Sequence, residues 1–304
     1  MRLTSIITVN FNQPEVTIQF LESVKLNIKE GQVEVILVDN HSDVDYGNDF
    51  IKVYPDLIYI RSDKNLGFAG GNNIGIERAK GDNILFLNND TEITDNLLFE
   101  LNKILDNDPS VGIVSPLILY YYSPEIIQYA GFSPMNYITC RNNIVGGMDL
   151  NVGQYDNISN ETSFCHGAAM MCRKSDLEVT GLMPENYFLY YEEFDWCERF
   201  KKSGKKIWFT GRTSVLHKES ISVGKESSIK TYFMTRNRIL FIRRNTSVLI
   251  TALFLAYYII IACPKQIYVQ IKKGRKDLIK WTIKGVVWNI INSTDSNNLG
   301  FKIK

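Results

Sequence analysis

The 304-residue sequence predicts an α/β fold: a mixed, mainly parallel sheet flanked by helices, followed by an apolar and basic helical tail. Two observations lead to this prediction. Short β-branched runs alternate with stretches of helical periodicity over the first 120 residues, as in right-handed βαβ units. Beyond residue 242 the composition changes to a long apolar run with Lys and Arg on both sides.

The expected elements follow from local patterns of apolar residues. Strands are expected at 3–9, 33–38, 57–61, 83–87, 111–119, 168–172 and 206–209, and helices at 14–29, 71–80, 94–106 and 192–203. Residues 120–163 are rich in Tyr, Asn and Gly and have no strong period, which predicts a long functional loop. We therefore expect a domain of residues 1–242, with halves of about 1–119 and 120–242, and a tail of residues 243–304.

Charge is distributed unevenly along the chain. The net charge is +1, yet residues 1–198 hold 12 basic and 29 acidic side chains, and residues 199–304 hold 22 and 4. The hydrophobic fraction of 45% excludes a disordered chain. The five cysteines form no CxxC pair, which is typical of a reducing compartment. The N-terminus lacks the pattern of a signal peptide, so a cytoplasmic protein is expected.

The apolar run of the tail indicates a membrane surface rather than nucleic acid as partner. Residues 248–263 contain no charge in sixteen positions, and Pro264 is expected to end the helix. A spanning helix needs about 20 apolar residues, so we favour a helix that lies in the interface and is held by its basic flanks. A helical hairpin buried against the domain and a spanning helix are the alternatives.

Polar residues follow the expected strands, at the edge where ligands bind to parallel sheets. Asp39 follows the second strand and could accept a hydrogen bond from a base or a ribose, or it could cap a turn. The segment from 61 to 73 contains three glycines that permit close backbone approach, and its amides could face phosphate oxygens. It matches neither a P-loop nor a dinucleotide fingerprint.

Two acidic sites carry the chemical prediction. Asn88, Asn89 and Asp90 follow the fourth strand, and oxygen ligands of this kind suit Mg²⁺ or Mn²⁺ shared with phosphates. Glu192, Glu193 and Asp195 gather at a helix start. The helix dipole alone could account for that position, but mutual repulsion raises the pKa of a carboxyl, as a general base requires.

The order and spacing of these segments closely resemble glycosyltransferase family 2, especially its bacterial rhamnosyltransferase branch. The resemblance covers residues 3–242 and is carried by IITVNFNQ, ILVDNHSD, NLGFAGGNNIGI, ILFLNNDTEI, YFLYYEEFDWCERFKKSGKKI, SVLHKESISVG and YFMTRNRILF. It implies a GT-A fold, with a nucleotide-sugar half at 1–119 and an acceptor half at 120–242. It also implies inversion at the anomeric carbon.

The resemblance implies a role for each site residue. The donor would be bound by Thr8, Asn10, Asp39, Asn65, Gly67, Asn72, Asn89 and Arg236, and the metal by Asp90, Asn88 and His217. Asn88 replaces the first Asp of the family's metal motif, and Glu193 replaces the Asp of its catalytic Glu-Asp pair. Glu193 is therefore the expected base, with Glu192 and Asp195 as alternatives. His217 gains a metal role through this resemblance, since an isolated His, such as His41 or His166, is more often structural.

The expected function is transfer of a sugar, with rhamnose as the favoured candidate, from a nucleotide diphosphate to a glycan or lipid-linked acceptor in cell-surface polysaccharide synthesis. The enzyme is expected to be peripheral on the inner face of the cell membrane. A non-catalytic sugar-binding subunit is the first alternative. A nucleotidyltransferase is the second, although Asn10-Phe11-Asn12-Gln13 takes the place of its basic phosphate loop. The acceptor, the linkage and the oligomeric state leave no signal in the sequence.

Overall fold

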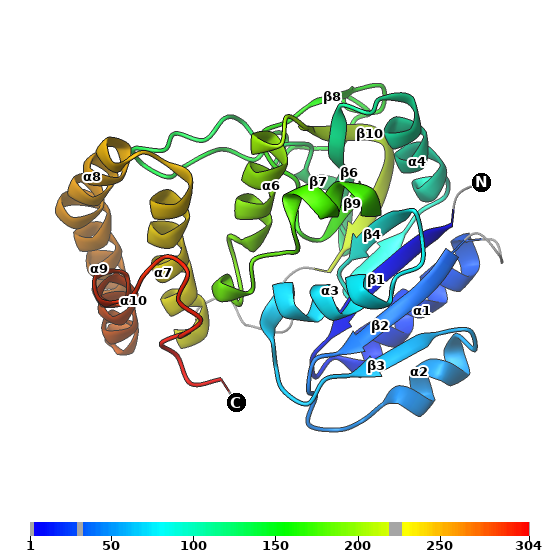
Figure 1. The fold of residues 1–304 in the computed structure, drawn as a ribbon, viewed down its shortest axis with the longest axis horizontal. Helices are drawn as coiled ribbons and strands as arrows, with labels where there is room; N and C mark the ends of the chain where they lie inside the picture. Colours follow the sequence, from blue (N-terminus) through cyan, green and yellow to red (C-terminus); the bar gives the residue numbers. More distant parts are fainter. Residues whose placement is uncertain (1–2, 29–32, 219–226, 304) are drawn as a thin grey trace.

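The computed structural model describes residues 3–28, 33–218 and 227–303, in which ten strands form one mixed sheet (Figure 1). The strands are β1 (Thr4–Asn10), β2 (Val33–Asp39), β3 (Ile58–Arg61), β4 (Asn83–Leu87), β5 (Thr91–Ile93), β6 (Val111–Tyr120), β7 (Ser123–Tyr129), β8 (Ser159–Glu161), β9 (Ala169–Arg173) and β10 (Lys206–His217). The main strand order is β3-β2-β1-β4-β9-β6-β10-β5. The expected helix end near residue 29 and most of the segment 214–224 lie outside the described ranges.

The predicted mixed, mainly parallel sheet is confirmed. The strands β1–β4, β6 and β10 run in one direction, and β9 is inserted antiparallel between β4 and β6. The expected strand at 206–209 is longer than predicted, since β10 continues through an irregularity between Thr210 and Ser214 to His217. The short strands β5, β7 and β8 were not predicted. They have no local pattern of their own and form by pairing with β6 or β10.

Helices cover both faces of the sheet. The helices that precede the tail are α1 (Pro14–Asn27), α2 (Gly47–Val53), α3 (Gly67–Arg78), α4 (Leu97–Asn107), α5 (Leu177–Thr180) and α6 (Glu192–Lys202). One apolar cluster joins α1, α2 and α4 to one face of the sheet, and a second joins α3 and α6 to the other. The sheet is thus the middle layer of three, and its strand ends remain available for a site.

Helix α3 begins earlier than the sequence predicts. It starts at Gly67, so the glycines of this segment lie inside the helix rather than in a turn before it. A Cβ at Gly75 would lie 2.4 Å from the Ile7 side chain, and one at Gly71 would lie 2.8 Å from that of Val9. These two glycines therefore allow α3 to pack closely on β1.

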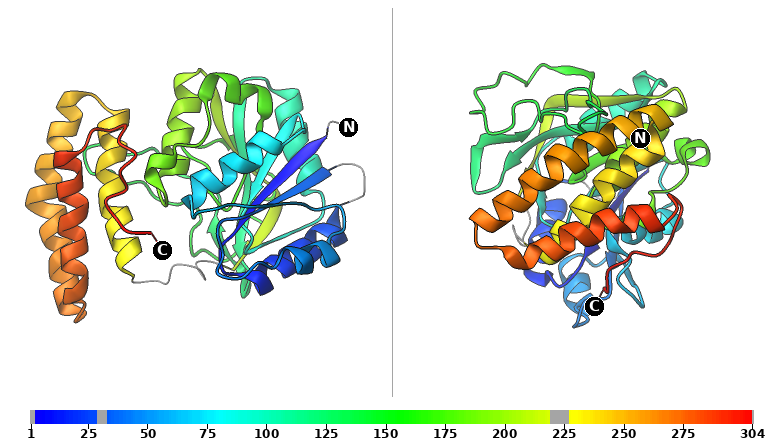
Figure 2. Two further views of the ribbon diagram at one scale, coloured as in Figure 1. Left: turned by 60° about the horizontal axis from the view of Figure 1, so that its bottom comes forward. Right: turned by 90° about the vertical axis from the view of Figure 1, so that its left-hand side faces the viewer.

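The C-terminal helices form a separate layer beside the sheet domain (Figure 2). They are α7 (Ser228–Asn245), α8 (Val248–Tyr257), α9 (Cys263–Lys272) and α10 (Ile279–Ile291). A π-helical segment, Tyr258–Ala262, joins α8 to α9, so one continuous helix runs from Val248 to Lys272. The boundary expected at residues 242–243 falls within the last turn of α7.

The prediction that Pro264 ends the apolar helix was wrong. Pro264 occupies the first turn of α9, directly after the π-helical segment. Proline lacks a backbone N–H, and a local change in hydrogen-bond register removes the need for that donor. The apolar helix is therefore 25 residues long, and of the described helices only this one is long and apolar enough to cross a membrane.

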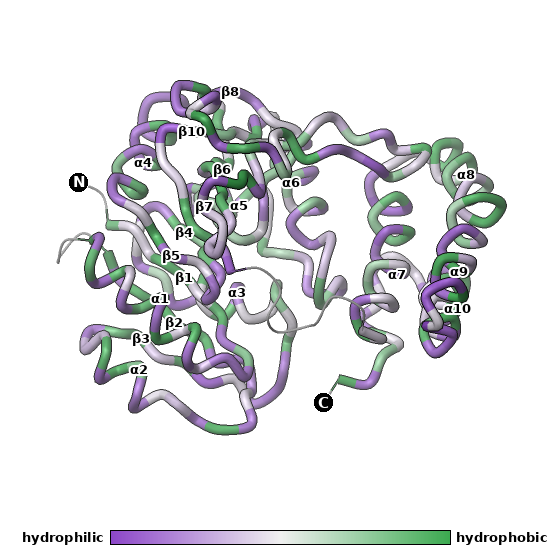
Figure 3. The backbone as a smooth tube through the Cα atoms, turned by 180° about the vertical axis from the view of Figure 1, so that it is seen from behind, coloured by the Kyte–Doolittle hydropathy of each residue, from purple (hydrophilic) through white to green (hydrophobic). Residues whose placement is uncertain are grey.

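The helices of this layer contain many apolar residues (Figure 3), and a number of these side chains are exposed. Only 17% of the most apolar stretch of the long helix is buried. We call the following exposed side chains of the long helix and α10 the apolar face: Val248, Leu249, Leu253, Ile259, Ile260, Ile261, Tyr268, Ile271, Ile283, Val287, Ile290 and Ile291. The exposed side chains of Lys272, Lys276, Lys280 and Lys284 belong to the same helices and their connection. A core helix hidden in a hairpin would not expose these residues.

Candidate active site

A cavity of about 460 Å³ opens where β1 and β4 end. Segments distant in sequence line it: the turn after β4, the start of α3, residues 188–193 and the end of β10. It includes the predicted residues Asn65, Gly67, Asn72, Asn88, Asn89, Asp90, Glu192, Glu193 and His217. We call it the sheet-edge cavity. The fold thus brings Asp90, Glu192 and Glu193 to one cavity, whereas Asp39 and Asp195, which were expected to share it, do not line it.

Asp90 and His217 are paired by strand register. Thr91 of β5 lies opposite His217 of β10, so the residue before Thr91 lies beside the imidazole. The distance from His217 Nε2 to Asp90 Oδ1 is 3.1 Å, and both side chains are buried. On its other side the His217 ring contacts Gln128, with Nδ1 2.7 Å from Oε1.

These two residues fit a divalent cation. Gln128 contacts Nδ1 of the His217 ring, so Nε2 is the ring nitrogen that faces Asp90 and could bind a metal. Asp90 Oδ1 is buried and has no hydrogen-bond donor among the described residues. A spacing near 3 Å suits adjacent ligands of an octahedral ion with bonds of about 2.1 Å. The described residues offer no group of three or more His, Cys, Asp or Glu for a metal, so other ligands would have to come from substrate and water.

Glu192 and Glu193 form an acidic pair at the start of α6 and line the same cavity. Burial raises the pKa of Glu193 to about 7. Burial and the neighbouring charge of Glu193 raise the pKa of Glu192 well above its usual range. The Glu193 side chain lies against Gly167, since a Cβ there would be 3.9 Å from its Cγ. Glu193 is therefore the carboxyl of this pair that changes protonation near neutral pH.

Asp195 belongs to the same helix but does not line the cavity. Its carboxylate accepts hydrogen bonds from Tyr187, Arg199, Arg244 and Asn245, at 2.7 to 3.3 Å. Two of these donors belong to α7, so Asp195 joins the sheet domain to the C-terminal layer. Both carboxylate oxygens of Asp195 are therefore engaged within the protein, and neither is available to the hydroxyl of an acceptor substrate. We exclude Asp195 from the proposed catalytic group.

The amides at the start of α3 are already engaged. Leu66 N–H donates to Asn40 Oδ1, Gly67 N–H to Asn65 Oδ1, and Phe68 N–H to the Phe188 carbonyl. Gly67 has φ +71°, and a Cβ on it would overlap the Phe188 carbonyl oxygen. We expected these amides to face phosphate oxygens, but in the structure each of them donates to another residue of the cavity wall.

Asp39, Asn10 and Thr8 lie behind the cavity wall rather than on it. All three are fully buried. The Asp39 carboxylate accepts from Asn10 Nδ2 at 2.7 Å and from the Ser42 amide at 2.9 Å. This network fixes the loops that follow β1 and β2. The Thr8 hydroxyl has no partner among the described residues.

Arg236 lies inside the C-terminal layer. Its guanidinium donates to the carbonyls of Tyr187 and Asn186 and to the side chain of Asn237, and it stacks 4.0 Å from the Trp288 ring centre. Burial lowers its pKa to about 10. It does not line the sheet-edge cavity, so its contacts are those of a packing residue rather than of a diphosphate ligand.

Several lining residues were missed by sequence reasoning. They are Val9, Phe11, Asn40, Phe68, Phe86, Leu87, Gln128, His166, Gly167, Ala168, Phe188, Leu189, Tyr190 and Ile229. His166 lies beside His217, with ring centres 5.9 Å apart, and burial lowers its pKa to about 3. Gln128 lies on β7, in the region that has no clear period. No local signal marks either residue.

Comparison with known proteins supports a family assignment. A family model described as "Glycosyl transferase family 2" matches residues 5–181. The low-salt glycan biosynthesis hexosyltransferase Agl10 of Haloferax volcanii is 29% identical over 241 residues, covering 78% of this chain and 74% of that protein. The dTDP-rhamnosyl transferase RfbF of Shigella flexneri is 25% identical over 244 residues, covering 74% and 76%.

Solved structures support the fold. GalNAc-T7 with UDP, GalNAc and Mn²⁺ has a TM-score of 0.68 and 15% identity, and the similarity covers 95% of this chain but 57% of that one. The mannosyltransferase PcManGT of Pyrobaculum calidifontis, in complex with GDP-Man and Mn²⁺, has a TM-score of 0.57 and 13% identity, with coverages of 95% and 87%. At these identities the likeness establishes a shared GT-A fold.

Proposed function

The chain belongs to glycosyl transferase family 2, as its sequence motifs predicted, and from this premise we propose that it is an inverting enzyme. It transfers a hexose from a nucleotide diphosphate to a glycan or lipid-linked acceptor in cell-surface polysaccharide synthesis. One observation carries the proposal: the Asp90–His217 pair and the Glu193 carboxyl line the same cavity.

Asp90 and His217 would hold Mg²⁺ or Mn²⁺, and Asn88 lies beside them on the cavity wall. A bound divalent cation neutralises the charge that develops on the departing nucleotide diphosphate. The Mn²⁺ named with two structural neighbours supports this choice of ion. Gln128 contacts the His217 ring and would orient it, and both proposed ligands are buried.

Glu193 would remove the proton of the attacking acceptor hydroxyl. A pKa of about 7 matches this role, because the carboxylate is available at neutral pH and still basic enough to take a proton. The oxygen then attacks the anomeric carbon from the side opposite the leaving group, which inverts that centre. Burial and the neighbouring charge of Glu193 raise the pKa of Glu192 well above its usual range, and we assign Glu192 a supporting role beside the base.

Rhamnose carried by dTDP is the donor that we favour. The similarity to RfbF supports it, and the similarity to Agl10 supports a hexose more generally. The donor would lie between the Asn65–Asn72 wall and the turn at Asn88–Asp90, where neutral amide side chains can bond sugar and ribose hydroxyls.

We further propose that the C-terminal layer holds the enzyme on the inner face of the cell membrane. The apolar face and its four lysines match the composition of an interfacial surface that binds anionic lipids. Because the long helix packs through Phe254, Tyr258 and Ala262 on the rest of the layer, a peripheral position preserves these contacts. The 25-residue length also permits a spanning helix.

The test of catalysis is release of nucleotide diphosphate by the purified full-length chain. The chain is incubated with dTDP-rhamnose or UDP-hexoses, with and without Mn²⁺, and with membrane extract as acceptor. We expect metal-dependent release with one donor and transfer of its sugar. Tight donor binding without turnover under any of these conditions would favour the non-catalytic subunit instead.

A further inference from the structure

A second cavity, of about 400 Å³, lies between α7, α9 and the segment that contains Arg141. Six cations line it and no acidic residue does: Arg141, Lys230, Arg238, Lys265, Lys273 and Arg275. We call it the basic cavity. Its volume falls within the range of about 300–1,000 Å³ that is usual for small-ligand pockets.

Four of these six cations have no carboxylate partner among the described residues, whereas Arg275 pairs with Asp277. In residues 3–28, 33–218 and 227–303, no carboxylate forms an ion pair with Arg141, Lys230, Arg238 or Lys265. Arg238 Nη2 donates to the Thr139 carbonyl, whereas its Nε is buried without an acceptor in the part of the chain that the structure describes. Like charges gathered around one space repel one another, so a multiply charged anion would stabilise them.

The basic cavity adjoins the sheet-edge cavity at the start of α7. Ile229 lines the sheet-edge cavity, and the next residue, Lys230, lines the basic cavity. The Lys230 ammonium lies 5.9 Å from the ring centre of Tyr190, which also lines the sheet-edge cavity. A single ligand could therefore place an anionic group in one cavity and a sugar in the other.

The basic cavity also adjoins the apolar face. Lys265 and Val269 of α9 line the cavity, while Tyr268 and Ile271 of the same helix are exposed on the apolar face. An α-helix is about 10 Å wide, and an interfacial helix sinks roughly 5–10 Å into the boundary between headgroups and acyl chains. If the apolar face contacts a bilayer, the basic cavity lies near the level of the lipid phosphates.

We propose that the basic cavity binds the diphosphate of a lipid-linked acceptor and so directs the acceptor sugar to Glu193. This inference rests on the proposed function, which it refines by assigning a site to the acceptor. Arg and Lys bind phosphate oxygens through charge-assisted hydrogen bonds, and the cavity supplies them from three separate segments. Bulk anionic headgroups and free diphosphate carry the same phosphate oxygens. The experiment must therefore distinguish these two from a lipid-linked diphosphate.

The experiment compares the full-length chain with two double variants. Arg141→Glu with Lys265→Glu reverses two exposed cations of the basic cavity. Lys25→Glu with Lys103→Glu makes the same charge change at exposed positions of the sheet domain, outside that cavity and outside the apolar face with its lysines. Binding of farnesyl diphosphate, of inorganic diphosphate and of phosphatidylcholine vesicles with phosphatidylglycerol is measured in EDTA, so that no metal supports binding at Asp90.

We expect farnesyl diphosphate to bind the unmodified chain and the control variant with the same affinity. Its binding to the cavity variant, Arg141→Glu with Lys265→Glu, should be weaker by about tenfold or more. Equal weakening in the control, or no binding to the unmodified chain, would overturn the inference. Equally tight binding of inorganic diphosphate would overturn the lipid-linked assignment. So would a loss confined to phosphatidylglycerol vesicles, because it would indicate a site for bulk headgroups.

A kinetic measurement separates this inference from the proposed function. With a lipid-linked acceptor, the cavity variant should raise the KM for acceptor about tenfold while the KM for donor is unchanged. Donor hydrolysis in the absence of acceptor should be equal in all three proteins. If all three lack turnover, the proposed function fails, yet the metal-free binding assay still decides whether the basic cavity takes a lipid diphosphate.

Discussion

Carboxylates from one turn of α6 lie in two different environments, the sheet-edge cavity and the junction between the sheet domain and the C-terminal layer. The two environments differ in the number of hydrogen-bond donors that they supply. Glu192 and Glu193 face the cavity, and Glu192 Oε2 and Asp90 Oδ1 have no hydrogen-bond donor among the described residues. At the junction, Asp195 has four donors, two of them arginines. Burial raises the pKa of both glutamates that face the cavity. An unsatisfied buried charge costs stability, so its presence indicates a partner that binds during function.

The largest expected effect is that of Glu193→Gln. Removal of the general base should lower kcat by about 10²–10⁴ while donor affinity, measured by calorimetry, is unchanged. Glu192→Gln is the matched control, because it makes the same exchange at the neighbouring carboxyl, whose pKa burial raises well above its usual range. Equal losses in the two variants would contradict the assignment of the base.

The negative charge of Asp90 should contribute strongly to metal binding and to catalysis. Asp90→Asn removes the anionic ligand, and we expect about a 10²-fold loss of kcat/KM and a higher Mn²⁺ concentration for half-maximal activity. Mn²⁺ binding, followed by electron paramagnetic resonance, should weaken in parallel. Normal Mn²⁺ affinity in this variant would place the metal elsewhere.

The pH profile of the unmodified enzyme follows from the raised pKa of Glu193. The base must be deprotonated to act, so kcat should be constant above about pH 7 and fall about tenfold per unit below it. At pH 5 this amounts to roughly a 10²-fold loss. The residual activity of Glu193→Gln should lack this slope. A profile that falls only below pH 5 would mean that the carboxyl titrates as an ordinary glutamate.

The apolar face offers a test on the second region of the molecule. Ile260→Asp with Ile290→Asp should weaken binding to phosphatidylcholine vesicles that contain phosphatidylglycerol by about 10–100-fold, because each isoleucine loses its transfer into lipid. Leu26→Asp with Val179→Asp makes the same exchange at exposed apolar positions of the sheet domain and should leave binding unchanged. Vesicle flotation measures both.

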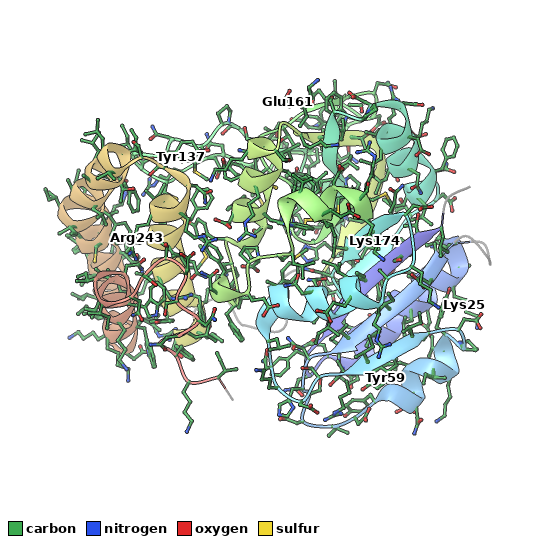
Figure 4. All side chains as sticks on the ribbon, viewed as in Figure 1. Lys25, Tyr59, Tyr137, Glu161, Lys174 and Arg243 are labelled. Atoms are coloured by element: carbon green, nitrogen blue, oxygen red, sulfur yellow. The ribbon has the colours of Figure 1, made fainter. Side chains whose placement is uncertain are left out.

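The smallest effect on catalysis is expected at Asp195. Asp195→Asn should lower the free energy of unfolding by about 2–3 kcal/mol, because two arginines and an asparagine lose a charged acceptor. The kcat of the folded fraction should stay within about threefold of the unmodified enzyme, since such effects on positioning are small compared with loss of a base. Urea titration measures the first quantity. Glu161→Gln, at an exposed position labelled in Figure 4, is the control for stability.

The sequence by itself determined the order of the main strands and helices, the fold class and the residues after β4 and at the start of α6. These features are local: β-branched runs, helical periodicity and acidic residues beside strand ends carry their own signal. The same is true of the apolar composition of the tail, although the π-helical segment that carries the helix past Pro264 was not foreseen.

Only the tertiary structure decided which polar residues share a cavity. Glu193 and Asp195 are two positions apart, yet the helical rotation between them directs one to the cavity and the other to α7. The contact between Asp90 and His217 depends on the register of β5 and β10, and the roles of Gln128 and His166 depend on pairing across the sheet. Such contacts join residues far apart in the chain, so no local pattern specifies them.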